Sequence, residues 1–123
     1  TLMLDISFYS QDKKALETIE ISEDFYNWLT QSEFAKIGKS EEKEMHGDGE
    51  AVKVSVVLLE GENRRRFSDF FRDAIVHESD RMLDKLGSSP SKEEYINASS
   101  RLKNLQDLRK IIEDERFKYL GRD

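Results

Sequence analysis

Residues 65 to 112 read RRFSDFFRDAIVHESDRMLDKLGSSPSKEEYINASSRLKNLQDLRKII. On both sides of the GSSPS segment (87 to 91), apolar residues recur at three- and four-residue steps, which is the spacing of amphipathic helices. They are Phe67, Phe70, Phe71, Ala74, Ile75, Met82 and Leu86 before the segment, and Tyr95, Ala98, Leu102, Leu105, Leu108, Ile111, Ile112 and Leu120 after it. The pattern predicts one helix from about 65 to 86 and a second of about 25 residues, packed antiparallel as a hairpin.

Both ends of the break carry helix signals. Gly87 suits the end of the first helix, because glycine readily adopts the left-handed conformation that follows a helix. Ser91 and Glu94 have the spacing of a capping box, in which each side chain binds a backbone N–H at the helix start. The second helix is therefore expected to begin at Ser91.

The first half of the sequence predicts strands and one helix. Residues 2 to 9 alternate in the period-2 pattern of a strand with one buried face. A second, shorter candidate runs from Leu16 to Ile21, where the pattern fits either an edge strand or part of a loop. Residues 51 to 60 are apolar on both faces, as in strands that lie inside a sheet. Ser22 has the position of an N-cap before a helix that runs from 23 to about 37, either continuous or broken near Ser32.

Residues 39 to 50, KSEEKEMHGDGE, contain almost no apolar side chains and predict a solvated acidic loop. The elements together predict an α+β fold: a small, mainly antiparallel sheet of about three strands, with the long C-terminal helical hairpin packed on one face. We expect one domain of residues 1 to 123, with the strands, one short helix and the acidic loop in 1 to 62 and the helical hairpin in 63 to 123.

Composition excludes several classes of site. The chain of 123 residues has no cysteine, which excludes disulfides, cysteine-ligated metal sites and thiol catalysis. Its longest apolar run is far below the roughly 20 residues that a membrane span needs. The sequence does not open with a basic segment followed by an apolar one, so we expect a cytoplasmic protein that does not enter a membrane.

The charge of the chain is segregated. Residues 1 to 62 carry six basic and fourteen acidic residues, a net charge of −8, whereas residues 63 to 123 carry fourteen basic and twelve acidic residues, a net charge of +2. An acidic half beside a mixed-charge half is typical of proteins that attract a basic partner. The acidic half therefore supplies the first candidates for a binding surface.

Spacings of three and four residues place a set of ionisable residues on one face of the first long helix: Asp69, Asp73, His77, Asp80 and Asp84. A carboxylate and an imidazole four residues apart can share a divalent ion, so Asp73 and His77 are the best metal candidates. The second helix offers no histidine to complete such a site. Because Arg72, Arg81 and Lys85 are interleaved with the carboxylates, we expect an ion-paired, solvated helix face and no metal or cofactor.

Motifs of common catalytic sites are missing from the sequence, including the nucleophile elbow, the Walker loop and the dinucleotide fingerprint. With two histidines and no cysteine, pairs of a nucleophile and a base are scarce. We therefore expect no catalytic residues and a protein that is not an enzyme. A metal-dependent hydrolase that uses Asp73 and His77 is the alternative.

One basic cluster, Arg64-Arg65-Arg66, precedes the first long helix. It could hold a phosphate at the helix start, where backbone donors and the helix dipole add to its charge. The sequence pI of about 5.1 argues against direct nucleic-acid binding, which needs a dominant basic face. We expect the cluster to bind a neighbouring acidic segment of its own chain.

Aromatic residues of the first helix are the second set of binding candidates. Trp28 is the only tryptophan, and helical spacing predicts that it packs inward with Phe25 and Leu29 while Tyr26 faces outward. If either aromatic side chain is exposed, it becomes the leading candidate for an interface anchor, because aromatic residues dominate binding hot spots.

These observations predict a small acidic protein-binding module, an inhibitor of the immunity-protein or antitoxin type that covers a basic surface of a toxin or nuclease. The expected partner-binding residues are Glu23, Asp24, Tyr26, Trp28, Glu41, Glu42, Glu44, Asp48 and Glu50. The alternative is a scaffold, adaptor or phage accessory protein that associates with itself through its helices. An apolar stripe wider than the domain can cover would indicate that second class.

Overall fold

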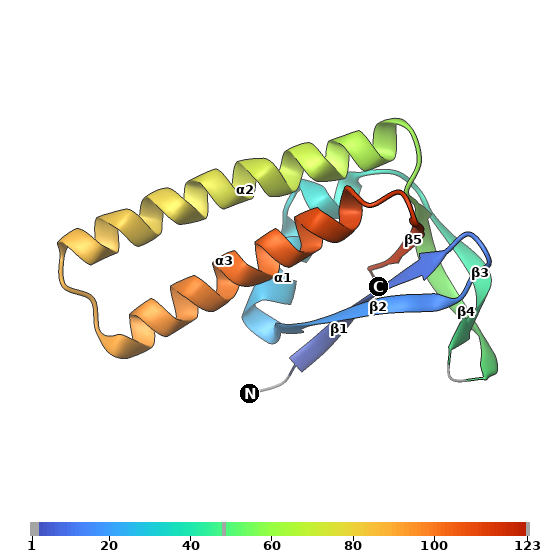
Figure 1. Ribbon diagram of the computed structural model, residues 1–123, viewed down its shortest axis with the longest axis horizontal. Helices are drawn as coiled ribbons and strands as arrows, with labels where there is room; N and C mark the ends of the chain where they lie inside the picture. The colour runs from blue at the N-terminus through green and yellow to red at the C-terminus, as the bar shows by residue number, and fades with distance from the viewer. Residues whose placement is uncertain (1–2, 48, 123) are drawn as a thin grey trace.

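The structure is a computed structural model and describes residues 3–47 and 49–122. The fold is α+β, with a five-stranded antiparallel sheet in the order β2-β1-β5-β4-β3 (Figure 1). The elements in chain order are β1 (Met3–Ser10), β2 (Ala15–Ser22), α1 (Glu23–Gln31), the 3-10 helix η1 (Glu33–Lys36), β3 (Ser40–Gly47), β4 (Glu50–Leu58), α2 (Glu62–Gly87), α3 (Lys92–Ile112) and β5 (Phe117–Gly121). Leu2, the first residue of the predicted N-terminal strand, lies outside the described residues.

The helical hairpin forms as its sequence predicts. The capping box at the start of α3 is complete: the Glu94 backbone N–H donates to Ser91 Oγ at 3.1 Å, and the Ser91 N–H donates to the Glu94 carboxylate at 3.2 Å. Ser22 caps α1 by accepting from the Phe25 N–H at 3.2 Å. In the described part of the chain, no helix is both long and apolar enough to cross a bilayer.

The main core lies between the helices and one face of the sheet. Phe67 and Phe71 from α2 are fully buried there, and aromatic rings from η1 and α2 pack edge to face or tilted, with Phe34 and Phe67 centroids 5.4 Å apart. The core takes residues from both halves of the sequence, including Ile6, Phe8, Ile21, Phe25, Leu29, Phe34, Ile37, Val57, Leu59, Leu105, Leu108, Ile112, Phe117 and Leu120.

The sheet curls at one end, so that its two edges meet. The turn between β1 and β2 reaches β3, where the His46 N–H donates to the Lys13 carbonyl at 2.7 Å and Lys14 forms a bridge with His46. A second, smaller apolar cluster fills the space inside the curl: Tyr9, Met45 and Val56.

The predicted acidic loop is wrong, because most of it is the edge strand β3. Its backbone pairs with β4 from Ser40 opposite Val57 to Gly47 opposite Glu50. β4 is apolar on both faces, and a strand of this kind sits inside a sheet and needs a neighbour on each side. The residues that border it in sequence provide one neighbour even though Met45 is their only buried side chain.

The predicted continuation of the second helix to Leu120 is also wrong. α3 ends at Ile112, and β5 then pairs with β1 and β4. The two apolar residues that extend the helical pattern, Phe117 and Leu120, enter the main core from this strand instead. The sheet therefore has five strands, where about three were predicted.

Candidate interaction surfaces

The outer halves of α2 and α3 extend beyond the core as a pair of helices with no sheet beneath them (Figure 1). Ile75 is the last apolar residue of α2, and Leu105 the first apolar residue of α3, that packs against the main core. The Arg101 guanidinium also lies over the Phe25 ring of that core, 5.4 Å from its centroid. We call residues 76–104 the distal hairpin. At about 1.5 Å per helical residue it projects roughly 18 Å past the core.

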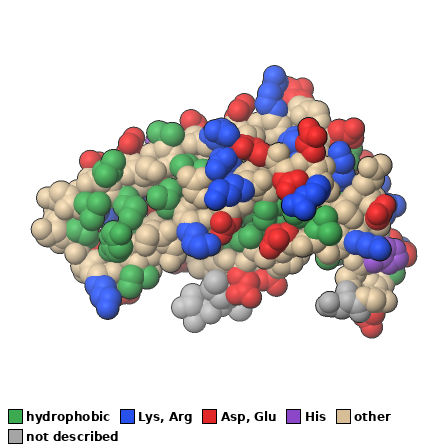
Figure 2. Space-filling model, viewed as in Figure 1, with side chains coloured by type: hydrophobic (Ala, Val, Ile, Leu, Met, Phe, Trp, Pro, Cys, Tyr) green, Lys and Arg blue, Asp and Glu red, His purple; other side chains and the backbone are tan. Residues whose placement is uncertain are grey.

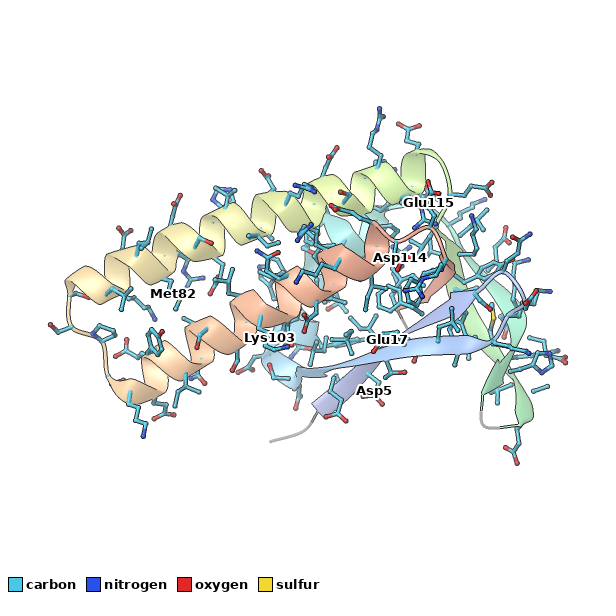
Figure 3. All side chains as sticks on the ribbon, in the orientation of Figure 1. Asp5, Glu17, Met82, Lys103, Asp114 and Glu115 are labelled. Carbon is cyan, nitrogen blue, oxygen red and sulfur yellow. The ribbon has the colours of Figure 1, made fainter. Side chains whose placement is uncertain are left out.

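The distal hairpin has an unusual distribution of apolar side chains. All of its residues are described, and Glu78 is the only one that is buried. Met82 lies between the two helices (Figure 3) but is only partly buried. Five large apolar side chains are exposed: Val76 57%, Leu83 65%, Leu86 50%, Tyr95 45% and Ile96 49%. We call these five residues the distal patch.

Figure 2 shows hydrophobic side chains gathered on one face of the distal hairpin, over both helices. At ordinary side-chain areas the distal patch exposes on the order of 500 Å², which is near the upper end for the largest apolar patch of a monomer. The other large apolar side chains that are exposed in the described chain are Leu16, Val52 and Leu58 on the sheet and Trp28 on α1. The patch is therefore a candidate docking surface.

The acidic residues expected to form one surface lie in two separate places. Glu23 and Asp24 begin α1, directly after Ser22, which pairs with Met3 at one end of β1. The tip of the β3–β4 hairpin instead lies beside the turn at the other end of β1. Seven residue steps along β1 separate these ends by about 20 Å.

The carboxylates of the β3–β4 hairpin are exposed but partly balanced by lysines. Glu42 and Glu44 lie on one face of β3, and Glu41 lies on the other. Lys43 forms an ion pair with Glu41 at 3.8 Å, and Lys53 lies opposite Glu44 on β4. Glu50 is exposed at the start of β4, and Asp48 lies outside the described residues.

The predicted orientation of the α1 aromatic residues is reversed in part. Tyr26 is half-buried against the main core, whereas Trp28 is 37% exposed. The Trp28 ring packs against Phe70 of α2, with centroids 5.7 Å apart, and the Arg101 guanidinium of α3 lies 5.5 Å from its centroid. Trp28 thus seals the junction of the three helices and keeps an exposed edge.

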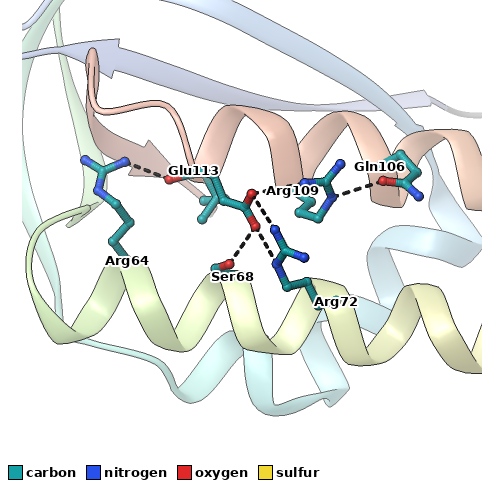
Figure 4. Close-up of polar contacts among 7 residues, drawn as sticks. Arg64, Ser68, Arg72, Gln106, Arg109 and Glu113 are labelled. Carbon is teal, nitrogen blue, oxygen red and sulfur yellow. Dashed lines mark hydrogen bonds and ion pairs between the residues drawn. The ribbon is translucent and has the colours of Figure 1, made fainter.

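A polar network closes the base of the hairpin (Figure 4). Glu113 accepts hydrogen bonds from Ser68 Oγ at 2.7 Å, from Arg72 Nε at 2.8 Å and from Arg109 Nη1 at 3.0 Å. Gln106 accepts from Arg109 at 3.0 Å and extends the network along α3. The hydrogen bond from Arg72, followed by that from Ser68, lowers the pKa of Glu113 below its ordinary value of 4.5.

The Glu113→Gln variant should be less stable by about 1 kcal/mol at neutral pH, because a solvent-screened, charge-assisted pair is lost. A carboxylate with a lowered pKa contributes stability above its unfolded pKa and loses it as pH falls through the folded pKa. The two proteins should therefore converge in stability below pH 4.5. Urea unfolding at several pH values tests this, with the exposed neighbour Glu115→Gln as control, and a pH-independent gap would contradict it.

The arginine cluster is dispersed among structural contacts. Arg64 donates to the carbonyl oxygens of Ile112 at 2.7 Å, Asp114 at 3.0 Å and Phe117 at 2.6 Å, and also to that of Leu59. Arg65 pairs with Glu62 at 3.4 Å. The expected contact with an acidic segment therefore holds for Arg65, whereas Arg64 binds backbone carbonyls.

The ionisable face of α2 differs from the predicted pattern of pairs. Arg72 binds Glu113, Arg81 binds Glu78 at 3.5 Å, and Lys85 binds Glu94 at 3.7 Å. Asp69 and Asp73 line an open groove with two arginines, Arg66 and Arg72, and with Glu33. Within residues 3–47 and 49–122, no three His, Cys, Asp or Glu side chains are grouped so that they could hold a metal ion.

Comparison with known proteins found no match to a family model, to a curated protein or to a solved structure.

Proposed function

We propose that this chain is a protein-binding module and that the distal patch is its docking surface. The observation that carries the proposal is that the distal hairpin has five exposed large apolar side chains and no buried apolar one. Each such side chain contributes about 1.5 to 3 kcal/mol when it is removed from water, so a docked protein surface gains directly from covering them. This belongs to the scaffold or adaptor class that the apolar helical stripes suggest.

The shape of the distal hairpin supports the same function. It projects from the core as two helices, so a partner can reach it without approaching the acidic sheet. Amphipathic helices commonly bind through apolar residues at i, i+3, i+4 and i+7. Val76 and Leu83 are seven residues apart on α2, and Leu86 follows three residues later.

Site-specific photo-crosslinking tests the proposal. Benzoylphenylalanine placed at Leu83 should give a discrete protein adduct in cells, and Leu86→Lys in the same patch should abolish it. The matched control places the crosslinker at Leu16, which is 49% exposed on the edge strand β2 and should give no discrete adduct. Absence of an adduct at Leu83, or equal adducts at both positions, would overturn the docking surface.

A second candidate is the inhibitor of the immunity-protein or antitoxin type, acting through β3. It is favoured by three exposed carboxylates on an edge strand, Glu41, Glu42 and Glu44. An acidic edge of this kind can steer a basic nuclease or toxin into contact and so speed association. The separation of Glu23 and Asp24 from the β3–β4 tip restricts this candidate to the strand hairpin, without the aromatic anchor of α1.

Charge reversal at Glu41, Glu42 and Glu44 to lysine should slow association with a basic nuclease encoded beside this chain at least about tenfold, because steering depends on complementary charge. The salt dependence of the on-rate should weaken, and folding should be unaffected because exposed charges contribute little to stability. Stopped-flow mixing measures the rate, with the triple variant Asp73→Lys, Asp80→Lys and Asp84→Lys on α2 as the charge-matched control. An unchanged on-rate would rule out steering by β3.

A further inference from the structure

We infer that the occupant of the distal patch is a second copy of this chain, so that two distal hairpins pack antiparallel into a four-helix bundle. The inference rests on the proposed function and names the partner. Three observations carry it. The distal hairpin has no apolar core of its own, its net charge is zero, and the acidic half of the chain lies toward the other end of the molecule.

The first property is that the distal hairpin has only one helix–helix seam. Two-helix hairpins bury one stripe per helix, and bundles complete a core by adding two more helices. The seam here holds the buried carboxylate of Glu78, paired with the exposed Arg81, and the partly buried Met82. A second hairpin adds the two helices that complete a bundle core, and its own distal patch is buried against the first one.

The second property is charge. Residues 76–104 contain five acidic residues (Glu78, Asp80, Asp84, Glu93 and Glu94) and five basic residues (Arg81, Lys85, Lys92, Arg101 and Lys103), so their net charge is zero. In a two-fold symmetric contact a surface meets itself, and a surface with net charge would repel its copy. The whole chain has a net charge of −6, so the distal hairpin is a long segment on which two copies can meet without net repulsion. A strongly charged partner would gain no electrostatic attraction from a surface whose net charge is zero.

The third property is the position of the acidic half. Residues 1 to 62 have a net charge of −8. The described part of this half, 3–47 and 49–62, forms four of the five strands and lies toward the opposite end of the molecule from the tip of the hairpin (Figure 1). Parallel hairpins would place the two sheets side by side, whereas antiparallel hairpins place them at opposite ends of the dimer. Charge therefore selects the antiparallel arrangement and predicts an elongated particle.

The exposed area is sufficient for such a contact. A standard interface buries about 800 Å² per partner, and the roughly 500 Å² of the distal patch supplies an apolar centre that the flanking charged residues extend as a rim. The exposed residues Lys92 and Glu93 at one end of α3 and Asp84 on α2 can form that rim. The contact would thus have the apolar centre and the polar rim that are usual in homodimer interfaces.

Sedimentation equilibrium of the full chain tests the inference, with Leu83→Lys against the matched control Leu16→Lys. The wild type should approach twice the chain mass of 14.4 kDa at tens of micromolar, and Leu16→Lys should behave in the same way. Leu83→Lys should raise the dimer dissociation constant at least about tenfold, because each monomer buries a charge in the apolar centre. Lysine brings the net charge closer to zero, so a loss of association cannot be ascribed to general repulsion.

A second variant, Tyr95→Lys on α3, keeps the test valid if Leu83→Lys disturbs α2, and far-UV circular dichroism checks that both fold. Added salt should strengthen the wild-type dimer slightly, since it screens the two acidic halves. A monomeric wild type at 100 μM, or equal dimerisation of the Leu83 and Leu16 variants, would overturn the inference.

The crosslinker at Leu83 distinguishes two outcomes: that the partner is not a second copy of the chain, and that the distal patch is not a docking surface at all. An adduct of twice the chain mass supports the second copy. An adduct with a different protein overturns the second copy and leaves the docking surface in place, whereas the absence of any adduct overturns both.

Discussion

Arg64→Met should lower the free energy of unfolding by about 3 to 4 kcal/mol, which would be among the largest effects of any single charged side chain here. The Arg64 guanidinium donates to four backbone carbonyls, those of Leu59, Ile112, Asp114 and Phe117. They belong to the segment after β4, to the end of α3 with the turn that follows it, and to the start of β5. Methionine keeps the apolar stem and removes every donor, so partly buried carbonyl groups are left without a partner.

Urea unfolding measures this loss, and Arg65→Met is the matched control. Arg65 is the next residue, is exposed, and makes only an i,i+3 ion pair with Glu62 at 3.4 Å. Exposed pairs of this type contribute about 0 to 1 kcal/mol. Burial lowers the pKa of Arg64 from its ordinary value, yet an arginine stays charged throughout the usual pH range. The difference between the two variants should therefore be independent of pH between 5 and 9, and losses of similar size would contradict the role of Arg64.

Local signals predicted the elements that depend on local contacts. The helical hairpin, its capping box at Ser91 and the N-cap at Ser22 all follow from side chains within four residues of each other along the chain. Period-2 alternation predicted β1 in the same way, whereas for Leu16 to Ile21 it left an edge strand or a loop open, and pairing with β1 makes this segment the strand β2. Such features depend on spacing that the sequence displays directly.

The elements that the sequence did not predict depend on distant partners. β5 has only five residues and pairs with β1, more than a hundred residues earlier. β3 has a single buried side chain, so its strand conformation follows from pairing with β4 and not from its own composition. The contacts of Arg64 and Glu113 join segments about fifty residues apart. From sequence alone, an arginine close to acidic residues predicts a surface ion pair as readily as hydrogen bonds to distant backbone carbonyls.

The candidate site divides in the same manner. An apolar stripe on the helical hairpin is visible in the sequence, but whether the stripe is covered depends on where the sheet ends beneath it. The main core stops at Ile75 and Leu105, and the exposed residues beyond these positions are known only once the sheet is placed. For the acidic candidates, closeness in the sequence did not mean closeness in space. Glu23 and Glu44 are in the same half of the sequence but lie toward different ends of β1.

Gly38→Ala should cost about 3 kcal/mol of stability, through two effects at the junction of η1 and β3. Gly38 has a φ of 67°, in the left-handed region, where a side chain costs about 1 to 2 kcal/mol. A Cβ atom there would also lie 2.8 Å from Nδ2 of Asn63 and 2.8 Å from Cγ1 of Val57. Neither neighbour moves easily, because Val57 is fully buried and Asn63 donates to the Leu58 carbonyl at 3.1 Å.

Gly49→Ala separates the two effects, because it introduces the same side chain at a positive φ of 82° with no atom within 4 Å of the new Cβ. It should lose only the backbone cost of about 1 to 2 kcal/mol, and the difference between the variants then measures the clash of Gly38→Ala with Val57 and Asn63. Thermal and urea unfolding of both proteins give that difference. Equal losses of unfolding free energy in the two variants would mean that Asn63 and β4 shift to accept a methyl group. The contact of the η1–β3 junction with the start of α2 would then be looser than its geometry indicates.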